Sequence, residues 1–227
     1  MHLPPGEPLI TTWRTVPLAE LCASLVPPTS ARAPRPWVVA IDGRSASGKS
    51  SLATGLAGLL PGSAIIHTDD LAWHEPMFAW GPQLAHDVLV PLRHSRRLDH
   101  RPPQWVARGR PGAIRVQDAD VVLVEGAGAN QRGLEGLLDV AIWVQSDFHA
   151  AEKRGLARDI ASGVNGDEAS ATEFWHSWMA HEVEFMAGHR PWERSRFVVN
   201  GTPDPPVAAD LVQVADLLDV PAPAPMA

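Results

Sequence analysis

The hydrophobic residues of the chain gather in five short runs, which are separated by longer segments with helical periodicity. The runs are WVVAI from Trp37, SAIIH around Ile65, DVVLVEG ending at Gly126, DVAIWV ending at Val144 and RFVVN ending at Asn200. Unbroken apolar runs of this length are typical of strands that are buried on both faces of a sheet. Their alternation with helical segments predicts an α/β fold, in which a five-stranded parallel sheet carries helices on both faces.

The helical segments follow from apolar residues spaced three and four positions apart. We expect helices at 17–25, 49–60, 82–95, 147–162, 167–188 and 207–218. Residues 1–36 are rich in proline and are interpreted as an appendage or cover, whereas 37–219 form one domain. The last residues, 220–227, are expected to be disordered.

The first apolar run leads directly into Gly43-Arg-Ser-Ala-Ser-Gly48-Lys49-Ser50, which has the GxxxxGK[ST] spacing of a phosphate-binding loop. The two glycines let the backbone curl so that amides point at phosphate oxygens, and the helix that follows adds its positive dipole end. The alternative is a plain Gly/Ser-rich turn between a strand and a helix. We predict that ATP and Mg²⁺ bind here, with contacts from Gly43, Ser45, Ala46, Ser47, Gly48, Lys49, Ser50 and Ser51.

Acidic residues follow the second and third strands of the predicted sheet. Asp69 and Asp70 come after one strand, and Glu125 ends the next. Ligands of open parallel sheets bind beyond the carboxyl ends of the strands, where these residues would meet the phosphate loop. We expect Asp69 to accept a proton from an attacking hydroxyl or to hold the metal, Asp70 to contact substrate, and Glu125 to bind Mg²⁺ with Ser50. Caps for the aspartates and an arginine salt bridge for Glu125 are the structural alternatives.

Two arginines are expected to contact the phosphates from the side opposite Lys49. Arg154 and Arg158 are four residues apart in a helical segment, so they share one face. Planar guanidinium groups suit the spread charge of a moving phosphoryl group, although paired arginines also occur on solvated helix faces. The loop at 162–166 would let this region, at about 150–170, open and close as a lid.

The acceptor pocket is expected between two loop regions that contain tryptophans. Trp73 and Trp105 could stack on a flat acceptor such as a nucleobase, and core packing is the alternative for each. The segment 93–115 holds seven arginines and a single acid, which we interpret as a solvated or anion-facing segment beside the nucleotide. Arg108 of this segment is our candidate for a substrate contact.

Composition narrows the classes of partner. A formal net charge of −7 without a long basic run argues against nucleic acid. Cys22 is the single cysteine, and the ten histidines lack the spacing of a zinc site. No apolar run is long enough for a membrane span and no signal sequence is visible, so we expect a cytoplasmic protein that is a monomer or homodimer and acts on a small molecule without binding membranes.

The motifs DGRSASGKS, IIHTDD, VVLVEG and KRGLARD, in this order and spacing, resemble the uridine kinase-like branch of the P-loop kinases, which includes phosphoribulokinase-like and nicotinamide riboside kinase-like enzymes. The resemblance covers about residues 37–200. It implies a three-layer P-loop NTPase fold with a helical lid, and an ATP- and Mg²⁺-dependent reaction. By position it implies that Asp69 is the general base, Glu125 contributes to the metal site, and Arg154 and Arg158 contact the phosphates.

The chain departs from that family on the acceptor side. It contains no tyrosine, although tyrosines often surround the nucleoside in uridine kinases, and its lid lacks a further arginine that is often found there. The sequence therefore predicts a kinase that phosphorylates an acceptor hydroxyl, with a nucleoside as one candidate. A nucleoside-monophosphate kinase and a kinase of a sugar, vitamin precursor or antibiotic are alternatives. A non-enzymatic ATP-binding switch is a further one, although the two aspartates favour an enzyme.

Overall fold

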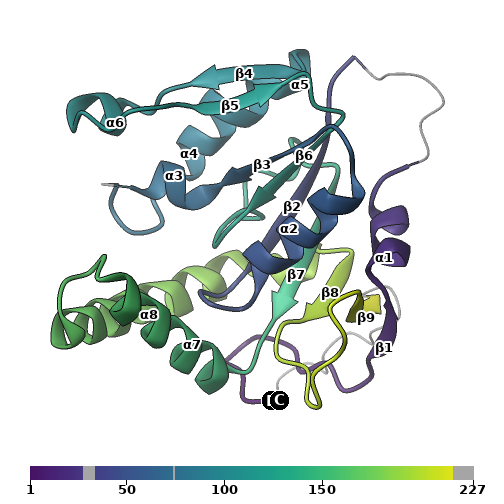
Figure 1. The fold of residues 1–227 in the computed structure, drawn as a ribbon, viewed down its shortest axis with the longest axis vertical. Coiled ribbons are helices and arrows are strands. Elements are labelled where there is room, and N and C mark those ends of the chain that lie inside the picture. The colour runs from purple at the N-terminus through teal and green to yellow at the C-terminus, as the bar shows by residue number, and fades with distance from the viewer. Residues whose placement is uncertain (28–33, 74, 217–227) are drawn as a thin grey trace.

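The computed structural model describes residues 1–27, 34–73 and 75–216, and it forms a seven-stranded sheet with helices on both faces (Figure 1). The strand order is β1-β9-β8-β7-β2-β6-β3, and β4 and β5 form a separate hairpin. The strands are β1 (Arg14–Pro17), β2 (Trp37–Gly43), β3 (Ser63–His67), β4 (Arg97–His100), β5 (Ile114–Gln117), β6 (Val121–Glu125), β7 (Val140–Gln145), β8 (Phe197–Asn200) and β9 (Leu211–Asp216).

The five predicted strands are confirmed as the parallel centre of the sheet, in the order β8-β7-β2-β6-β3. Their side chains alternate between two apolar layers, as the two-residue period of a strand requires. Val39 and Ile41 of β2 face the side covered by α1 and α2, and Val38 and Ala40 face the opposite side. The expected three-layer α/β arrangement follows from this alternation.

Two antiparallel strands extend this sheet, and the sequence did not predict either of them. Residues 207–218 were expected to be helical, which is wrong for 211–216: these form β9, which pairs with β8 on one side and β1 on the other. Helical spacing of the leucines and valines suggested the helix. Because an edge position beside β8 offers both backbone pairing and an apolar face, tertiary context overrides that local pattern.

The helices of the described residues are α1 (Leu18–Leu25), α2 (Lys49–Leu59), α3 (Thr68–Ala72), α4 (Gly81–Gln83), α5 (Val90–His94), α6 (Pro103–Ala107), α7 (Phe148–Ser162) and α8 (Glu168–His189). The helices predicted at 17–25, 49–60, 82–95, 147–162 and 167–188 are confirmed close to these bounds, whereas α3 and α6 were not predicted. A π-helical turn, Leu84–Leu89, joins α4 to α5 within the helix predicted at 82–95. Pro91 follows this turn and has no N–H to donate, which accounts for the widened backbone hydrogen bonding just before it. A 3₁₀ turn, Pro191–Arg194, follows α8.

The N-terminal segment is part of the sheet structure. Its strand β1 pairs with β9, and α1 packs its apolar face onto α2 through Leu21, Cys22 and Leu25. The predicted boundary at residue 37 therefore does not separate it from the packed core. The tail at 220–227 lies outside the described residues. Within the described ranges, no helix has the length and apolar character needed to cross a bilayer.

Candidate active site

The phosphate-loop sequence forms a tight turn between the end of β2 and the start of α2. Gly48 has φ 105° and Ala46 has φ 57°, both in the left-handed region. A Cβ on Gly43 would lie 2.7 Å from the carbonyl oxygen of Val144, so only glycine fits where the loop leaves the sheet. The loop thus has the curled backbone that the sequence predicts.

Some hydrogen-bond donors of the loop are available to bind an anion. The ammonium of Lys49 donates to the carbonyl oxygen of Arg44 at 2.8 Å and so lies across the loop. Among the described residues, the amides of Ala46 and Gly48 donate to no protein acceptor. Ser50 and Ser51 are exposed in the first turn of α2. Open amides, a helix start and a lysine together suit the phosphates of a nucleotide.

Asp42, directly before the loop, anchors it to the segment that follows β6. This fully buried carboxylate accepts hydrogen bonds from the amides of Gly43 at 2.7 Å, Gly128 at 2.9 Å and Asn130 at 2.8 Å. Burial raises the pKa of Asp42 to about 6, although these amides and the charge of Lys49 act in the opposite direction. Sequence analysis missed this residue, and its signal was an acid at the end of an unbroken apolar run.

A second buried anchor comes from the N-terminal segment. Glu7 accepts a hydrogen bond from Nε of Arg44 at 2.9 Å, with both side chains almost fully buried. The other oxygen of Glu7 accepts from the indole of Trp143 at 2.7 Å and from Gln145 at 3.1 Å. The N-terminal segment therefore supports the phosphate loop directly, through a contact that no local sequence pattern signals.

The predicted metal-binding residues lie together beside the loop. The hydroxyl of Ser50 lies 3.2 and 3.3 Å from the carboxylate oxygens of Glu125, which is buried at the end of β6. Nδ1 of His67 lies 2.5 Å from the same carboxylate, a neighbour that sequence analysis did not assign. Burial alone would raise the pKa of Glu125, but the contact with His67 and the charge of Lys49 lower it overall. The hydrogen bond with Glu125 in turn raises the pKa of His67.

These residues fit Mg²⁺. Magnesium takes oxygen ligands, keeps several waters and usually has only one or two protein ligands beside the phosphates. The hydroxyl of Ser50 and the carboxylate of Glu125 supply such oxygens next to the open amides. In the described ranges, no group of three or more His, Cys, Asp or Glu side chains is placed to hold a metal, so a site here would need phosphate and water oxygens as well.

Asp69 lies in the first turn of α3, directly after β3, and is exposed to solvent. The surrounding protein still raises its pKa through desolvation, and the charge of Glu125 acts in the same direction. The charges of Lys49 and Arg158 act the other way, which shows that both cations lie within electrostatic range of this carboxylate. The structure thus brings together the predicted base, the loop lysine and one lid arginine.

Asp70 has a different environment from its neighbour. It accepts a hydrogen bond from Nη2 of Arg110 at 2.8 Å. The guanidinium of Arg110 lies between two aromatic rings, 3.6 Å from the centroid of Trp105 and 4.8 Å from that of Trp73. The indole of Trp105 also donates to the carbonyl oxygen of Asp70 at 2.8 Å. Asp70 is therefore part of a hydrogen-bonded and packed cluster with Trp105, Arg110 and Trp73.

This cluster corrects the predicted acceptor contacts. Trp105 is buried and Arg110 covers its ring, so its face is not open for the expected stacking on an acceptor. Trp73 is 39% exposed, although Arg110 also lies over its ring. Arg108 is exposed at the end of α6, whereas Arg110 is the arginine that reaches the site. The segment 93–115 therefore contacts Asp70 through Arg110, and the substrate contact expected of Arg108 stays a prediction.

The predicted lid arginines lie on α7. Arg154 donates to the carbonyl oxygen of Gly201 at 3.0 Å, and Gly201 itself adjoins the phosphate loop, because a Cβ there would lie 1.9 Å from the carbonyl oxygen of Ser47. Arg158 bonds to Asp159 at 2.8 Å and is 62% exposed. Arg154 is therefore near the loop, and both arginines have donors left for a phosphate.

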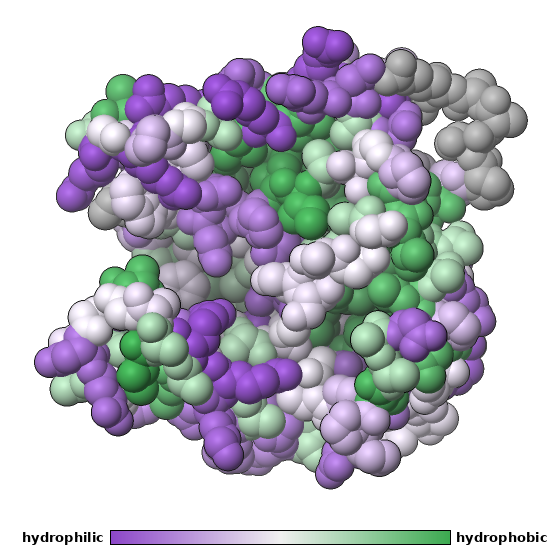
Figure 2. All heavy atoms as spheres, in the orientation of Figure 1, coloured by the Kyte–Doolittle hydropathy of each residue, from purple (hydrophilic) through white to green (hydrophobic). Residues whose placement is uncertain are grey.

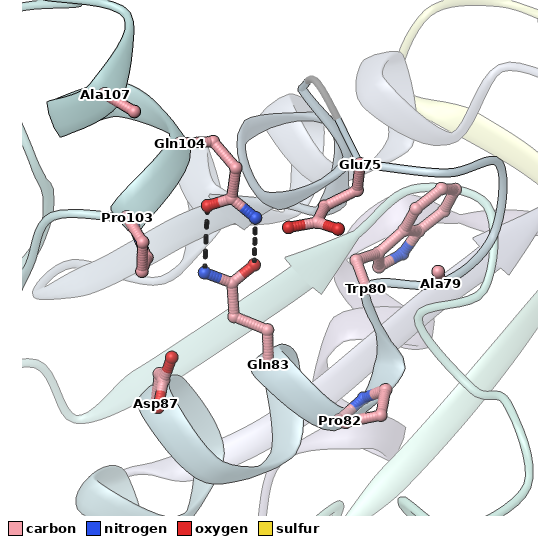
Figure 3. A pocket seen from close by; sticks show the side chains of 9 residues that line it. All are labelled: Glu75, Ala79, Trp80, Pro82, Gln83, Asp87, Pro103, Gln104 and Ala107. Carbon is pink, nitrogen blue, oxygen red and sulfur yellow. Dashed lines mark hydrogen bonds between the residues drawn. The ribbon is translucent and has the colours of Figure 1, made fainter.

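The space-filling view shows a hollow between the lobe of α3 and α6 and the helices α7 and α8 (Figure 2). On the α3–α6 lobe a cavity of about 510 Å³ is lined by Glu75, Trp80, Gln83, Asp87 and Gln104, among others (Figure 3). The carboxamides of Gln83 and Gln104 bond each other at 3.3 and 3.4 Å. A volume of this size suits a small organic molecule.

The fold matches a solved structure. A candidate fructose transport system kinase from Silicibacter sp. TM1040 is 22% identical, with a TM-score of 0.50 over 82% of this chain and 98% of that one. The chain shares the fold of that protein. A candidate uridine kinase from Bacillus stearothermophilus is 18% identical at a TM-score of 0.49, covering 80% of this chain and 96% of that one.

A third similar structure is a D-glycerate 3-kinase from Cryptococcus neoformans var. grubii, which is 15% identical at a TM-score of 0.45 over 73% of this chain and 84% of that one. No family model matches the sequence, and no curated protein matches it. The likeness to the Silicibacter structure establishes the fold, and the chemistry is argued from the site itself.

Proposed function

We propose that this protein is an ATP- and Mg²⁺-dependent small-molecule kinase that transfers the γ-phosphoryl group to an acceptor hydroxyl. The observation that carries the proposal is the position of Asp69, a carboxylate within electrostatic range of the loop lysine and of Glu125. A protein that only binds a nucleotide needs no such carboxylate on the acceptor side. The solved kinase structure that shares the fold offers an analogy for this class of reaction, while the site residues carry the argument.

The residues of the chain divide into two groups in this reaction. On the donor side, the amides of the loop and Lys49 hold the polyphosphate, and Arg154 and Arg158 approach it from α7. Ser50 and Glu125 would hold Mg²⁺ together with phosphate oxygens, and the ion would supply positive charge that offsets the charge of the phosphates. These groups favour a phosphoryl group whose negative charge is spread over its oxygens, because their positive charges are already in place.

On the acceptor side, Asp69 orients the hydroxyl and takes its proton. The raised pKa of Asp69 makes its carboxylate a better proton acceptor than an ordinary exposed aspartate. Asp70, held by Arg110, shapes the wall next to the attacking oxygen. Trp73 is 39% exposed beside this wall, and we expect it to contact a flat acceptor.

We propose a nucleoside as the first acceptor class to test. A partly exposed indole and the cavity with its paired carboxamides offer both stacking and hydrogen bonding, which a nucleobase uses. The protein would act on small molecules in the cytoplasm, as a monomer or homodimer, without a nucleic-acid or membrane partner.

The test is product analysis by mass spectrometry after incubation with Mg·ATP and single acceptors. The panel contains nucleosides, nucleoside monophosphates, sugars and hydroxy acids, each run with and without protein. A product heavier by one phosphoryl group, formed with equimolar ADP, supports the proposal and identifies the acceptor. ATP binding without any phosphorylated product across the panel would instead favour a nucleotide-dependent switch.

A further inference from the structure

A glutamate of helix α8, Glu182, accepts hydrogen bonds from Ser45 of the phosphate loop. Oε1 of Glu182 accepts a hydrogen bond from the amide of Ser45 at 2.9 Å and another from its hydroxyl at 2.7 Å. One turn earlier in α8, the indole of Trp178 donates to the hydroxyl oxygen of Ser45 at 2.8 Å. Both polar groups of this loop residue are therefore engaged by α8.

Glu182 is an unusual residue for a purely structural contact. Its side chain is fully buried, and its second oxygen, Oε2, has no hydrogen-bond partner among the described residues. Burial of a carboxylate is costly unless its oxygens are bonded, and a neutral side chain of similar shape would avoid that cost. The negative charge itself therefore calls for an explanation at this position.

The contact lies at one end of the phosphate cradle. The ammonium of Lys49 bonds to the carbonyl oxygen of Arg44, the residue directly before Ser45. Because the lysine of such a loop reaches the β- and γ-phosphates, Ser45 marks the end where the transferred phosphoryl group belongs. Glu182 thus places a carboxylate at the γ-phosphate end of the cradle.

Helix α8 also contacts the α3–α6 lobe, which we call the acceptor lobe because the proposed acceptor would bind there. The ring of Trp178 packs against Phe78, with centroids 4.8 Å apart, and stacks near Trp80 at 6.1 Å. Trp80 in turn lines the cavity of the α3–α6 lobe (Figure 3). Trp178 therefore touches the acceptor lobe with its ring and the phosphate loop with its N–H.

We propose that Glu182 is a positioning residue for phosphoryl transfer. Its carboxylate accepts the hydrogen bonds of the Ser45 amide and hydroxyl, so these groups are not free to donate to the terminal phosphate. The terminal phosphate therefore remains oriented toward the acceptor lobe. The charge of the carboxylate adds repulsion in the same sense. Tighter binding of the donor in its ground state does not speed transfer. This arrangement therefore lowers the affinity for ATP but keeps the γ-phosphate aligned with the acceptor hydroxyl. The inference rests on the proposed function and refines its donor site.

The experiment compares wild type, Glu182→Gln, Glu182→Leu and the matched control Glu184→Gln. Glu184 lies on the same helix but is exposed. Calorimetry gives the dissociation constants for Mg·AMP-PNP, which has a terminal phosphate, and for Mg·ADP, which lacks it. We expect both Glu182 variants to bind AMP-PNP more tightly relative to ADP, by about threefold or more for Glu182→Leu, with no change in the control.

Turnover supplies the second measurement. With the acceptor that the panel identifies, kcat of Glu182→Leu should fall about tenfold or more, because the phosphoryl group is misplaced. Glu182→Gln keeps one oxygen on Ser45 and is expected to fold and to restore most of kcat. Unchanged or weakened AMP-PNP binding relative to ADP in Glu182→Gln would overturn the inference. The nucleotide ratio is measured without an acceptor, so it tests Glu182 even if the panel shows that the protein is no kinase.

Discussion

Arg110 bonds to Asp70 at 2.8 Å while its guanidinium lies 3.6 Å from the centroid of the Trp105 ring. The two adjacent acids therefore differ in their surroundings: Asp70 is paired with an arginine, whereas Asp69 is exposed in the first turn of α3. The arginine-rich segment 93–115 thus contacts α3 through one packed residue, Arg110.

Replacement of Arg110 should affect the acceptor more than the donor. Arg110→Gln removes the charge and the ring contacts, so Asp70 and Trp73 lose their fixed positions. We expect KM for the acceptor to rise about tenfold, while KM for ATP stays within about twofold. Steady-state kinetics with each substrate varied in turn measures this. Arg115→Gln, which removes an exposed arginine from the same hairpin, is the control.

A neutral side chain at Asp69 should stop transfer without preventing donor binding. Asp69→Asn keeps the shape but cannot take the proton of the hydroxyl, so kcat should fall about a hundredfold or more. Affinity for Mg·AMP-PNP should change little, as calorimetry can show. Turnover equal to wild type would remove Asp69 from the proposed mechanism.

The close approach of Gly201 to the phosphate loop gives a test of loop geometry that leaves every polar residue in place. A Cβ on Gly201 would lie 1.9 Å from the carbonyl oxygen of Ser47, so Gly201→Ala must displace backbone. We expect ATP affinity to fall about tenfold or more. Gly188→Ala is the matched control, because nothing lies within 4 Å of a Cβ there. Equal nucleotide affinity in both variants would show that the loop tolerates this displacement.

The buried carboxylate of Asp42 predicts a pH dependence of stability. Its pKa is raised from 3.8 to about 6 in the folded protein, so between these values the folded state binds the proton that the unfolded state has lost. The stabilising contribution is present at low pH and disappears as the pH rises through about 6.

Comparison with Asp42→Asn isolates this contribution, because the other titrating groups are common to both proteins. We expect urea unfolding to show that the free energy of unfolding of wild type, minus that of Asp42→Asn, is larger at pH 5 than at pH 7. An equal or smaller margin at pH 5 would contradict the raised pKa.

The parts of the fold that are encoded locally could be predicted from the sequence. An apolar run with no polar interruption, such as the one before Asp42, is enough to identify a buried strand, and the spacing of Gly43, Gly48 and Lys49 identifies the loop. Strand β9 could not be predicted, because its residues have a helical pattern and only the neighbouring strands select the extended form.

In the site too, some features could be predicted from local sequence, whereas others depend on tertiary contacts. Asp69, Glu125 and Ser50 meet because they follow strands that are neighbours in the sheet. The choice of Arg110 over Arg108 depends on which side chain packs between two rings, and that is a tertiary property. Glu7 and Glu182 are far from the loop in sequence, so their contacts with it are visible only in the folded chain.

We infer above all that the phosphate loop binds a nucleoside triphosphate through its amides and Lys49. Calorimetric titration of the wild type with Mg·AMP-PNP, beside Lys49→Ala and Lys153→Ala, tests it most directly, because these are the two lysines of the chain. We predict saturable binding to wild type and Lys153→Ala, and affinity reduced about tenfold or more in Lys49→Ala. No binding of AMP-PNP or of its guanine counterpart by the folded wild type, or binding that Lys49→Ala leaves unchanged, would contradict the account.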